Sequence, residues 1–265
     1  LSITDRSLSI EVPAGRSLTL IGNGTDPIFR LDQVTGSQFS LNNTLLRDGF
    51  NATPGGGIAI DDGTAVVTLT NVVITNNESL SHGGGIGIAS TDPIQLVLLD
   101  SDITSNASGG EGGGIGGQVS ADATLTVTNS VIRLNASAGN GAGISLRPVP
   151  GTGNVDVTID IQLTRFEQNT TSAGGGGGLF ASSGNSIMNR LFVDVLDSTF
   201  VENRAPDGTG GGLALFGLAS VNTSRVNVKR NSFIANFSES SGGGASIGVV
   251  RAHVVNNSFI ANRSG

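Results

Sequence analysis

Large apolar residues recur along most of the chain in a fixed arrangement that repeats roughly every thirty residues. In each repeat two of them lie two positions apart, as Val67 and Leu69 do, and a third follows five residues later, as Ile74 does. The residue between the first two is often polar, such as Thr68. Alternation with a period of two is typical of a half-buried β-strand. Each strand is too short to be stable alone, so neighbouring repeats must stack to bury a core.

A run of glycines followed by an apolar residue opens each repeat. The run reads Gly-Gly-Gly-Ile at 55–58, 83–86 and 112–115, and looser copies lie at 141–144, 176–179, 210–213 and 242–245. Consecutive glycines suit a tight corner, where the backbone needs positive φ or a close approach. The variation in repeat length falls after this strand, in segments such as 61–64, 147–154 and 181–189. We expect these segments to be loops on one side of the molecule.

An asparagine follows the third strand of each repeat, six or seven residues before the glycines. These corner asparagines are Asn77, Asn106, Asn135, Asn169, Asn203, Asn236 and Asn262, and Gly49 takes the equivalent place in the first regular repeat. Asparagine tolerates the left-handed conformation at a corner. Stacked asparagine side chains can also pair amide to amide between coils. The pattern therefore predicts an internal asparagine ladder.

Three strand candidates in each repeat predict an all-β fold, the right-handed parallel β-helix or solenoid. We expect about nine coils with three short strands each, rising by ~4.8 Å per coil. Residues 1–265 form a single β-helix domain in this interpretation, with an irregular first coil over 1–38 and regular repeats over 39–265. Within the first coil, 1–3, 8–10, 18–20 and 28–31 have the composition of short strands.

The alternation of Gly-Gly-Gly-Ile with Phe-x-x-Asn, as at 166–169 and 200–203, resembles the repeats of chlamydial polymorphic outer membrane proteins. Those repeats read Gly-Gly-Ala-(Ile/Leu/Val) and Phe-x-x-Asn, and related β-helix repeats occur in large bacterial and protist surface proteins. The resemblance covers roughly residues 39–265. This chain differs in its third glycine, and in Ile74, Ile103 and Ile132 where the family has Phe. The resemblance implies a surface-exposed or secreted adhesive or structural protein without catalytic residues.

Composition narrows the function further. The chain has no Cys, which excludes disulfides and thiolate metal sites, and it has neither Trp nor Tyr, the usual platforms of sugar-binding clefts. Its net charge is −7, and Lys229 is the single lysine beside 13 arginines. The absence of a basic stripe argues against nucleic acid and anionic membranes as partners. The longest apolar runs are only strand-length, so we expect no membrane insertion.

Asn-x-Ser/Thr sequences give a second interpretation of the corner asparagines. They occur at 11 of the 23 asparagines, including every corner asparagine except Asn203. The candidate N-glycosylation sites are Asn23, Asn42, Asn51, Asn77, Asn106, Asn135, Asn169, Asn222, Asn236, Asn256 and Asn262. They predict glycans along one edge of a eukaryotic secreted rod. In the ladder interpretation the Ser or Thr only fills the turn, and one side chain cannot serve both roles.

A pair of acids near a histidine suggests an enzymatic alternative. Asp61 and Asp62, followed by His82, faintly resemble the Asp-Asp and Gly-His-Gly motifs of polygalacturonases, which are also β-helix proteins. Two carboxylates flanking a glycosidic bond are the chemistry that such enzymes need. However, no Asn-Thr-Asp precedes the pair and no Arg-x-Lys follows the histidine. The acids also fit a turn, and His82 fits a loop beside the glycines.

Two binding functions found on solenoids are weaker alternatives. Calcium could bind to columns of acids, but the Gly-Gly-x-Gly-x-Asp repeat is absent, and Asp100, Asp102 and Asp197 fit turn caps. Ice binding needs flat threonine arrays. Thr68, Thr70, Thr126 and Thr128 lie on outward strand positions, but later coils place Asp194, Asn227 and Lys229 there.

The leading expectation is a non-catalytic rod at the cell surface or outside the cell, an adhesin stalk or a fibre subunit without a cofactor. The chain stops where the next Gly-Gly-Gly-Ile is due, and neither end shows the polar cap that isolated solenoids need. We therefore expect end-to-end stacking between copies, or continuation in a longer chain. A host or matrix surface ligand would fit an adhesin. The alternatives are a polysaccharide-acting enzyme and a carbohydrate-binding surface module.

Overall fold

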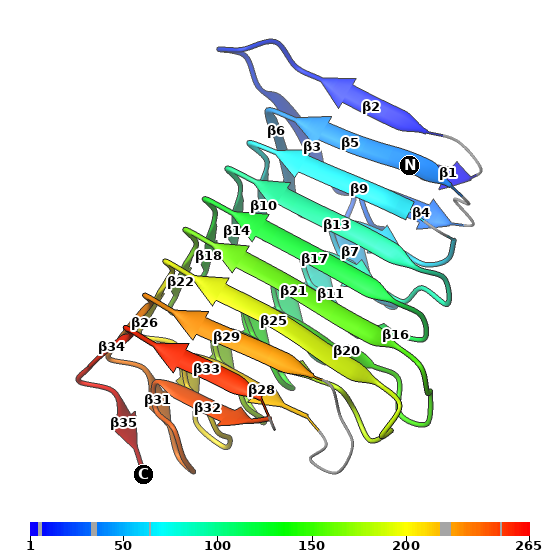
Figure 1. The fold of residues 1–265 in the computed structure, drawn as a ribbon. Coiled ribbons are helices and arrows are strands. Elements are labelled where there is room, and N and C mark those ends of the chain that lie inside the picture. The colour runs from blue at the N-terminus through cyan, green and yellow to red at the C-terminus, as the bar shows by residue number, and fades with distance from the viewer. Residues whose placement is uncertain (5–6, 33–35, 64, 218–223, 250) are drawn as a thin grey trace.

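Four parallel β-sheets run the length of the molecule in the computed structural model, which describes residues 1–4, 7–32, 36–63, 65–217, 224–249 and 251–265 (Figure 1). Every element of regular secondary structure within these residues is a β-strand, and every strand pairing is parallel. The chain passes through the sheets in the same order in each coil, so consecutive coils stack along one axis (Figure 1). The expected fold class, an all-β right-handed parallel β-helix of about nine coils, is confirmed.

Two of the sheets contain the Gly-Ile strands and the alternating Val/Leu strands. Sheet A consists of β1 (Ser2–Thr4), β4 (Phe29–Asp32), β8 (Ile58–Ile60), β12 (Ile86–Ile88), β16 (Ile115–Val119), β20 (Ile144–Pro148), β24 (Leu179–Ser182), β28 (Leu213–Phe216) and β32 (Ala245–Gly248). Sheet B consists of β2 (Leu8–Glu11), β5 (Ser37–Asn42), β9 (Ala65–Thr70), β13 (Ile94–Leu99), β17 (Ala123–Thr128), β21 (Asp156–Gln162), β25 (Arg190–Leu196), β29 (Arg225–Lys229) and β33 (Ala252–Val255).

The other two sheets flank the corner asparagines. Sheet C consists of β3 (Leu18–Ile21), β6 (Thr44–Arg47), β10 (Val73–Thr75), β14 (Asp102–Thr104), β18 (Val131–Arg133), β22 (Arg165–Glu167), β26 (Thr199–Val201), β30 (Ser232–Ile234) and β34 (Ser258–Ile260). Sheet D consists of β7 (Phe50–Asn51), β11 (Glu78–Ser79), β15 (Ala107–Ser108), β19 (Ala136–Ser137), β23 (Thr170–Thr171), β27 (Arg204–Ala205), β31 (Phe237–Ser238) and β35 (Arg263–Ser264). The sequence pattern did not predict sheet D, because a two-residue strand cannot show a periodicity.

The core is a set of columns in which equivalent residues of successive coils lie in register. Ile74 pairs with Ile103, which pairs with Ile132, and this column then continues as phenylalanines. The rings of Phe166, Phe200, Phe233 and Phe259 stack face to face, with centroids 4.6, 4.9 and 4.8 Å apart. These separations match the spacing between neighbouring strands. Each apolar side chain therefore contacts its own counterpart one coil above and below.

The turns next to sheet C use left-handed backbone at positions that the sequence only partly identifies. Before sheet C, the polar slot holds Asn71, Asp100, Asn129, Asp197 and Asn256, all with positive φ. Leu163 and Arg230 occupy the same slot with φ of 52° and 57°. At the asparagine corner our expectation is corrected, because the residue before the asparagine takes the positive φ, as Asn76 does at 55°. This residue makes the bend, and the asparagine side chain can then turn inward.

Long connections emerge on the side of the molecule where sheet A leads into sheet B, as the variable repeat lengths predicted. From β8 to β25 the described connections occupy 61–63, 89–93, 120–122, 149–155 and 183–189. Thr64 of the expected loop 61–64 lies outside the described residues. No described helix is long and apolar enough to cross a membrane.

Candidate functional site

The corner asparagines form a continuous internal ladder. The Oδ1 atom of Asn135 accepts hydrogen bonds from both the backbone N–H and the Nδ2 of Asn106, at 3.0 and 3.1 Å. The Nδ2 of Asn135 also donates to the carbonyl of Ile103 in the preceding coil and to Oδ1 of Asn169 in the following one. Each ladder side chain thus connects three successive coils. The same pattern runs from Asn77 to Asn262, and the backbone N–H of Gly49 donates to Asn77.

A second polar ladder, which the sequence analysis missed, lies at the turn between sheets B and C. The backbone N–H of Ser101 donates to Oγ of Ser130, that of Thr164 to Oγ of Ser198, and that of Ser198 to Oδ1 of Asn231. All five residues are buried. The signal was a Ser, Thr or Asn directly after the polar slot in nearly every repeat. It was hard to detect because three residue types fill the same position.

Burial at the corner changes the interpretation of the Asn-x-Ser/Thr sequences. Asn77, Asn106, Asn135, Asn169 and Asn236 are at most 1% exposed, which leaves no room for a glycan in the folded chain. The following Ser or Thr is the inward residue of sheet D and is also buried. The hydroxyl of Ser137, for example, donates to the carbonyl of Gly139 at 2.8 Å. The motif at these five positions is therefore structural, and the expectation of glycans there is corrected.

The remaining candidate glycosylation sites differ in exposure. Asn51 is 5% exposed, and its Nδ2 donates to the carbonyl of Pro54 at 2.7 Å. Asn262 is half-buried and donates to the carbonyl of Phe233. Asn222 lies outside the described residues. The exposed or half-exposed candidates are Asn23, Asn42 and Asn256.

The outer face of sheet A is partly covered by the chain itself. The outward residue at the second position of each strand is small and buried in most coils, namely Ala59, Gly87, Gly116, Ser145 and Ala214. A Cβ atom on Gly87 would lie 2.0 Å from the backbone nitrogen of Gly55, and one on Gly116 would lie 2.4 Å from that of Gly83. The segment leading into each glycine corner therefore folds across this column. We call these covering segments, which include Gly55, Gly83 and Glu111, the ledge.

A cluster of polar side chains joins the ledge to sheet A. Glu111, which is 7% exposed, accepts hydrogen bonds from Nε of Arg147 at 2.9 and 3.1 Å, from Asn140 at 3.0 Å and from Ser145 at 3.1 Å. Burial raises the pKa of Glu111, but the hydrogen bonds and charge of Arg147 outweigh it, so this pKa lies below its ordinary value. Glu111 is the only buried carboxylate in the described ranges, and its charge is neutralised by Arg147.

Asp61, Asp62 and His82, which suggested an enzyme, each interact with a different partner. Asp61 pairs with Arg30, and burial raises the pKa of Asp61 despite that positive charge. Asp62 accepts a hydrogen bond from the hydroxyl of Thr91 at 2.8 Å. Nδ1 of His82 accepts from the backbone N–H of Glu111 at 3.1 Å, and burial lowers the pKa of His82. Among the described residues no hydrogen bond or ion pair joins His82 to either aspartate.

A groove of about 380 Å³ lies on the outer face of sheet A towards its C-terminal end. Arg147, Ser182 and Phe216 lie on neighbouring strands of its floor. The other residues that line it are Asn140, Pro150, Phe180, Gly184, Asn185, Gly217 and Gly248. The rings of Phe180 and Phe216 are 6.1 Å apart and inclined at 49°. The groove therefore combines an apolar wall with the guanidinium of Arg147 and side-chain amides.

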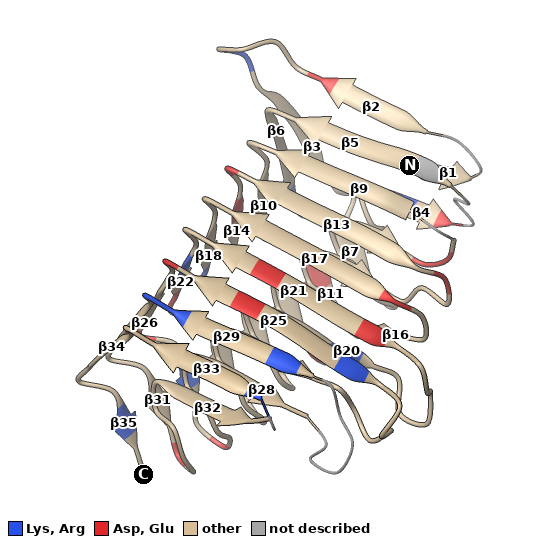
Figure 2. Ribbon diagram, viewed as in Figure 1, with Lys and Arg blue, Asp and Glu red and all other residues tan. Residues whose placement is uncertain are grey.

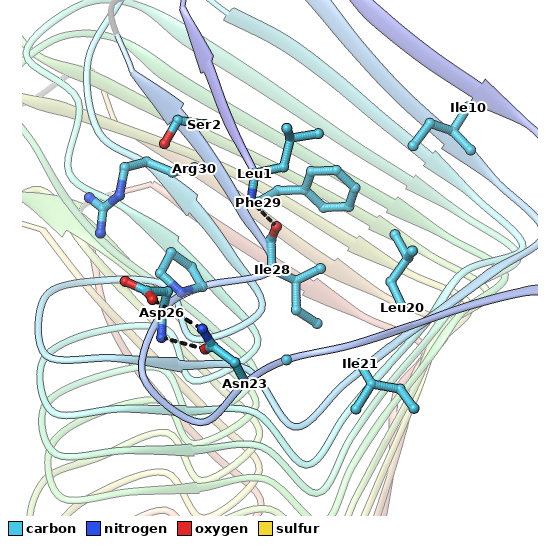
Figure 3. A pocket seen from close by; sticks show the side chains of 12 residues that line it. Leu1, Ser2, Ile10, Leu20, Ile21, Asn23, Asp26, Ile28, Phe29 and Arg30 are labelled. Carbon is cyan, nitrogen blue, oxygen red and sulfur yellow. Dashed lines mark hydrogen bonds between the residues drawn. The ribbon is translucent and has the colours of Figure 1, made fainter.

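A second hollow, of about 510 Å³, is the open first coil of the stack (Figure 3). Leu1, Ile10, Leu20, Ile28 and Phe29 are arranged around it. In later coils the equivalent apolar side chains are covered by the next coil along the axis. At the other end of the stack, Val254 and Phe259, which continue the inward columns of Val228 and Phe233, are 47 and 51% exposed. Both ends thus present core residues to solvent.

The outer face of sheet B changes character along the axis. After Glu11 on β2, strands β5, β9, β13 and β17 carry no charged residue, and charges return on β21, β25 and β29 (Figure 2). Asp160 and Asp194 lie in register on adjacent strands, and burial together with the charge of Asp194 raises the pKa of Asp160. The threonines of β9 and β17 are separated by Val97 and Leu99 on β13. No group of three metal-ligating side chains occurs within the described ranges.

Comparison of the chain with protein-family models, with curated proteins and with solved structures gave no match. The parallel solenoid of about nine coils is thus the part of the family resemblance that the structure shows. The surface location and adhesive role that the resemblance implies belong to the proposal that follows.

Proposed function

We propose that this protein is a non-catalytic extracellular rod with a structural or adhesive role at a cell surface. The observation that carries the proposal is the unbroken ladder from Gly49 to Asn262, which holds the coils in one continuous stack. A rigid stack positions surface loops at fixed intervals, which suits display and attachment. The buried carboxylate Glu111 is matched by Arg147, so it stabilises the ledge instead of serving as a free acid or base.

Adhesion is tested directly with beads coated with the protein. We expect coated beads to be retained on cell monolayers or on extracellular matrix under flow, while beads coated with heat-unfolded protein wash off. Equal loss of both kinds of bead from every surface would contradict an adhesive role.

The competing enzymatic function is tested with the same protein. Incubation with a panel of acidic and neutral polysaccharides is expected to release no new reducing ends. If reducing ends appear and His82→Ala abolishes them, the protein is a polysaccharide-acting enzyme and the non-catalytic proposal fails.

The open ends of the stack support a further part of the proposal. Exposed strand edges with apolar side chains are templates for another strand, and β32 to β35 offer such edges at one end while β1 to β3 offer them at the other. We propose that an additional coil packs on each end, from a second copy arranged head to tail or from further coils of the same chain. Sedimentation at increasing concentration distinguishes these sources, because only stacking between copies increases the mass.

A further inference from the structure

The groove on sheet A stands out because it interrupts the pattern of small outward residues. The residue in register with Ser145 is Phe180, in a column that otherwise holds Ala, Gly or Ser from β8 to β32. The next outward column holds Arg147, and further along Phe216 pairs in register with Ser182 and Gly248. Two aromatic rings and a guanidinium are therefore placed together on the outer face of sheet A.

Arg147 is held in place through its Nε atom, which leaves its Nη atoms available as hydrogen-bond donors. Its Nε spans both oxygens of Glu111, and Asn140 and Ser145 fix that carboxylate from two further directions. Neither Nη atom of Arg147 has a hydrogen-bond partner among the residues that the structure describes. The side chain is 21% exposed and lines the groove. The guanidinium thus offers a rigid pair of Nη donors to whatever enters.

Such a pair of donors selects a particular acceptor. A guanidinium fork matches the two oxygens of a carboxylate and forms two parallel hydrogen bonds with it. Because Glu111 already neutralises the charge of Arg147, long-range attraction to an anion is weak, and recognition depends on this direct fork. The ligand must therefore bring its carboxylate into contact with Arg147.

The walls of the groove define the rest of the ligand. The half-buried ring of Phe216 offers apolar surface, which fits the C–H face of a sugar ring, and Phe180, which is only 8% exposed, lies beside it. Ser182 and the exposed Asn185 provide a hydroxyl and an amide for sugar hydroxyl groups. A volume of about 380 Å³ is within the range of small-molecule sites. We infer that this groove binds a carboxylate-bearing sugar, with Arg147 on the carboxylate and Phe216 against the ring.

This inference rests on the proposed adhesive role, since it names the class of surface ligand that the rod would hold. Isothermal titration calorimetry with a trimer of galacturonic acid tests it, and the methyl ester of the same trimer is the matched ligand without the charge. We expect the acid to bind at least tenfold more tightly than the ester. Equal affinity for the two, or no binding of the acid, would overturn the inference.

Two variants assign the binding to the groove. Arg147→Lys keeps a positive charge beside Glu111 but loses the planar fork, and should weaken binding of the acid at least tenfold. Phe216→Ala removes a half-buried ring without touching the Glu111 cluster, and should weaken acid and ester alike. Arg133→Lys replaces an exposed arginine of sheet C outside the groove; it is the control and should bind as the wild type does.

Circular dichroism melting of each variant separates loss of the site from loss of the fold. Unchanged affinity in both folded groove variants would show that the sugar binds elsewhere, which contradicts the inference. Retention of coated beads on cells in the absence of uronates still tests the adhesive role by itself, so the two proposals can fail separately.

Discussion

The asparagine corner and the loop corner belong to the same coils but tolerate change very differently. Two residues separate sheet C from sheet D in every coil from β10 to β35, whereas the described connections from sheet A to sheet B range from three residues at 120–122 to seven at 149–155 and 183–189. At the asparagine corner each polar group is bonded to groups in the neighbouring coils. At the loop corner most described residues are exposed or half-buried. Hydrogen bonding between coils, more than strand pairing, therefore decides where this fold can vary.

Insertion of residues should give the largest difference in stability between the two corners. One glycine inserted between Leu134 and Asn135, in the two-residue link between β18 and β19, would shift this ladder side chain against its neighbours, and we expect a loss of more than about 4 kcal/mol in unfolding free energy. Two glycines inserted after Gly151 lengthen an exposed loop and should cost less than about 1 kcal/mol. Guanidinium denaturation measures both. Similar losses in the two proteins would show that the corners are equally constrained.

Removal of one ladder side chain is the next largest effect. Asn135→Ala leaves the Nδ2 of Asn106 and the carbonyl of Ile103 without their buried partner, and should destabilise the protein by about 3 kcal/mol. Asn185→Ala, in an exposed loop, serves as the matched control and should change stability by less than about 0.5 kcal/mol. The comparison fails if both variants melt alike.

The cluster beneath the groove should give a smaller, pH-dependent effect. Glu111→Gln removes the charge that matches Arg147 and should lower the unfolding free energy by about 2 kcal/mol at pH 7. Because the folded-state pKa of Glu111 is lowered, its contribution is complete above the unfolded-state value of about 4.3 and is lost as the pH falls through the folded-state pKa.

The difference between wild type and variant, measured by urea denaturation from pH 7 down to pH 3, should therefore shrink below about pH 4.3. Using the difference also reduces the contribution of His82, which both proteins contain and whose pKa is lowered by burial. A difference that grows towards acid pH would contradict the assignment.

Relief of a strained turn should give the smallest effect, and it stabilises the protein. Leu163 is 56% exposed and has a φ of 52°, in a slot that holds Asn or Asp in most coils. Leu163→Asn should raise stability by about 0.5 to 1 kcal/mol, since asparagine accepts left-handed backbone more readily. Leu163→Ala lacks this tolerance and should give no gain. Thermal melting of the three proteins is the measurement.

The sequence predicted the fold well where one residue type recurs, and poorly where several types share a role. Ile74, Phe166 and the corner asparagines repeat one side chain at one spacing, because each must fit its own counterpart in the next coil. The second ladder of Ser101, Thr164 and Asn231 has one geometry but varied chemistry, so no motif identifies it. The hydrogen bonds explain why: any short side chain with an acceptor oxygen can receive the backbone N–H.

The groove was beyond prediction for another reason. Arg147 and Glu111 are 36 residues apart and meet only because the ledge crosses sheet A. No sequence pattern predicts this crossing, since the side chains of the ledge do not repeat from coil to coil. Asp61 and His82 had a suggestive spacing, but the same topology directs them to different partners.

The ladder has a consequence for how such a molecule can change in size. The Oδ1 atom of every internal asparagine accepts hydrogen bonds from the asparagine of the preceding coil. Its own N–H groups donate to the Oδ1 atom of the asparagine in the following coil. A duplicated coil would meet surfaces that already match it, and a deleted coil would leave two surfaces that match each other. The rod can therefore lengthen or shorten in whole steps of ~4.8 Å without a redesigned interface. Its length is a countable quantity, set by the number of repeats in the gene.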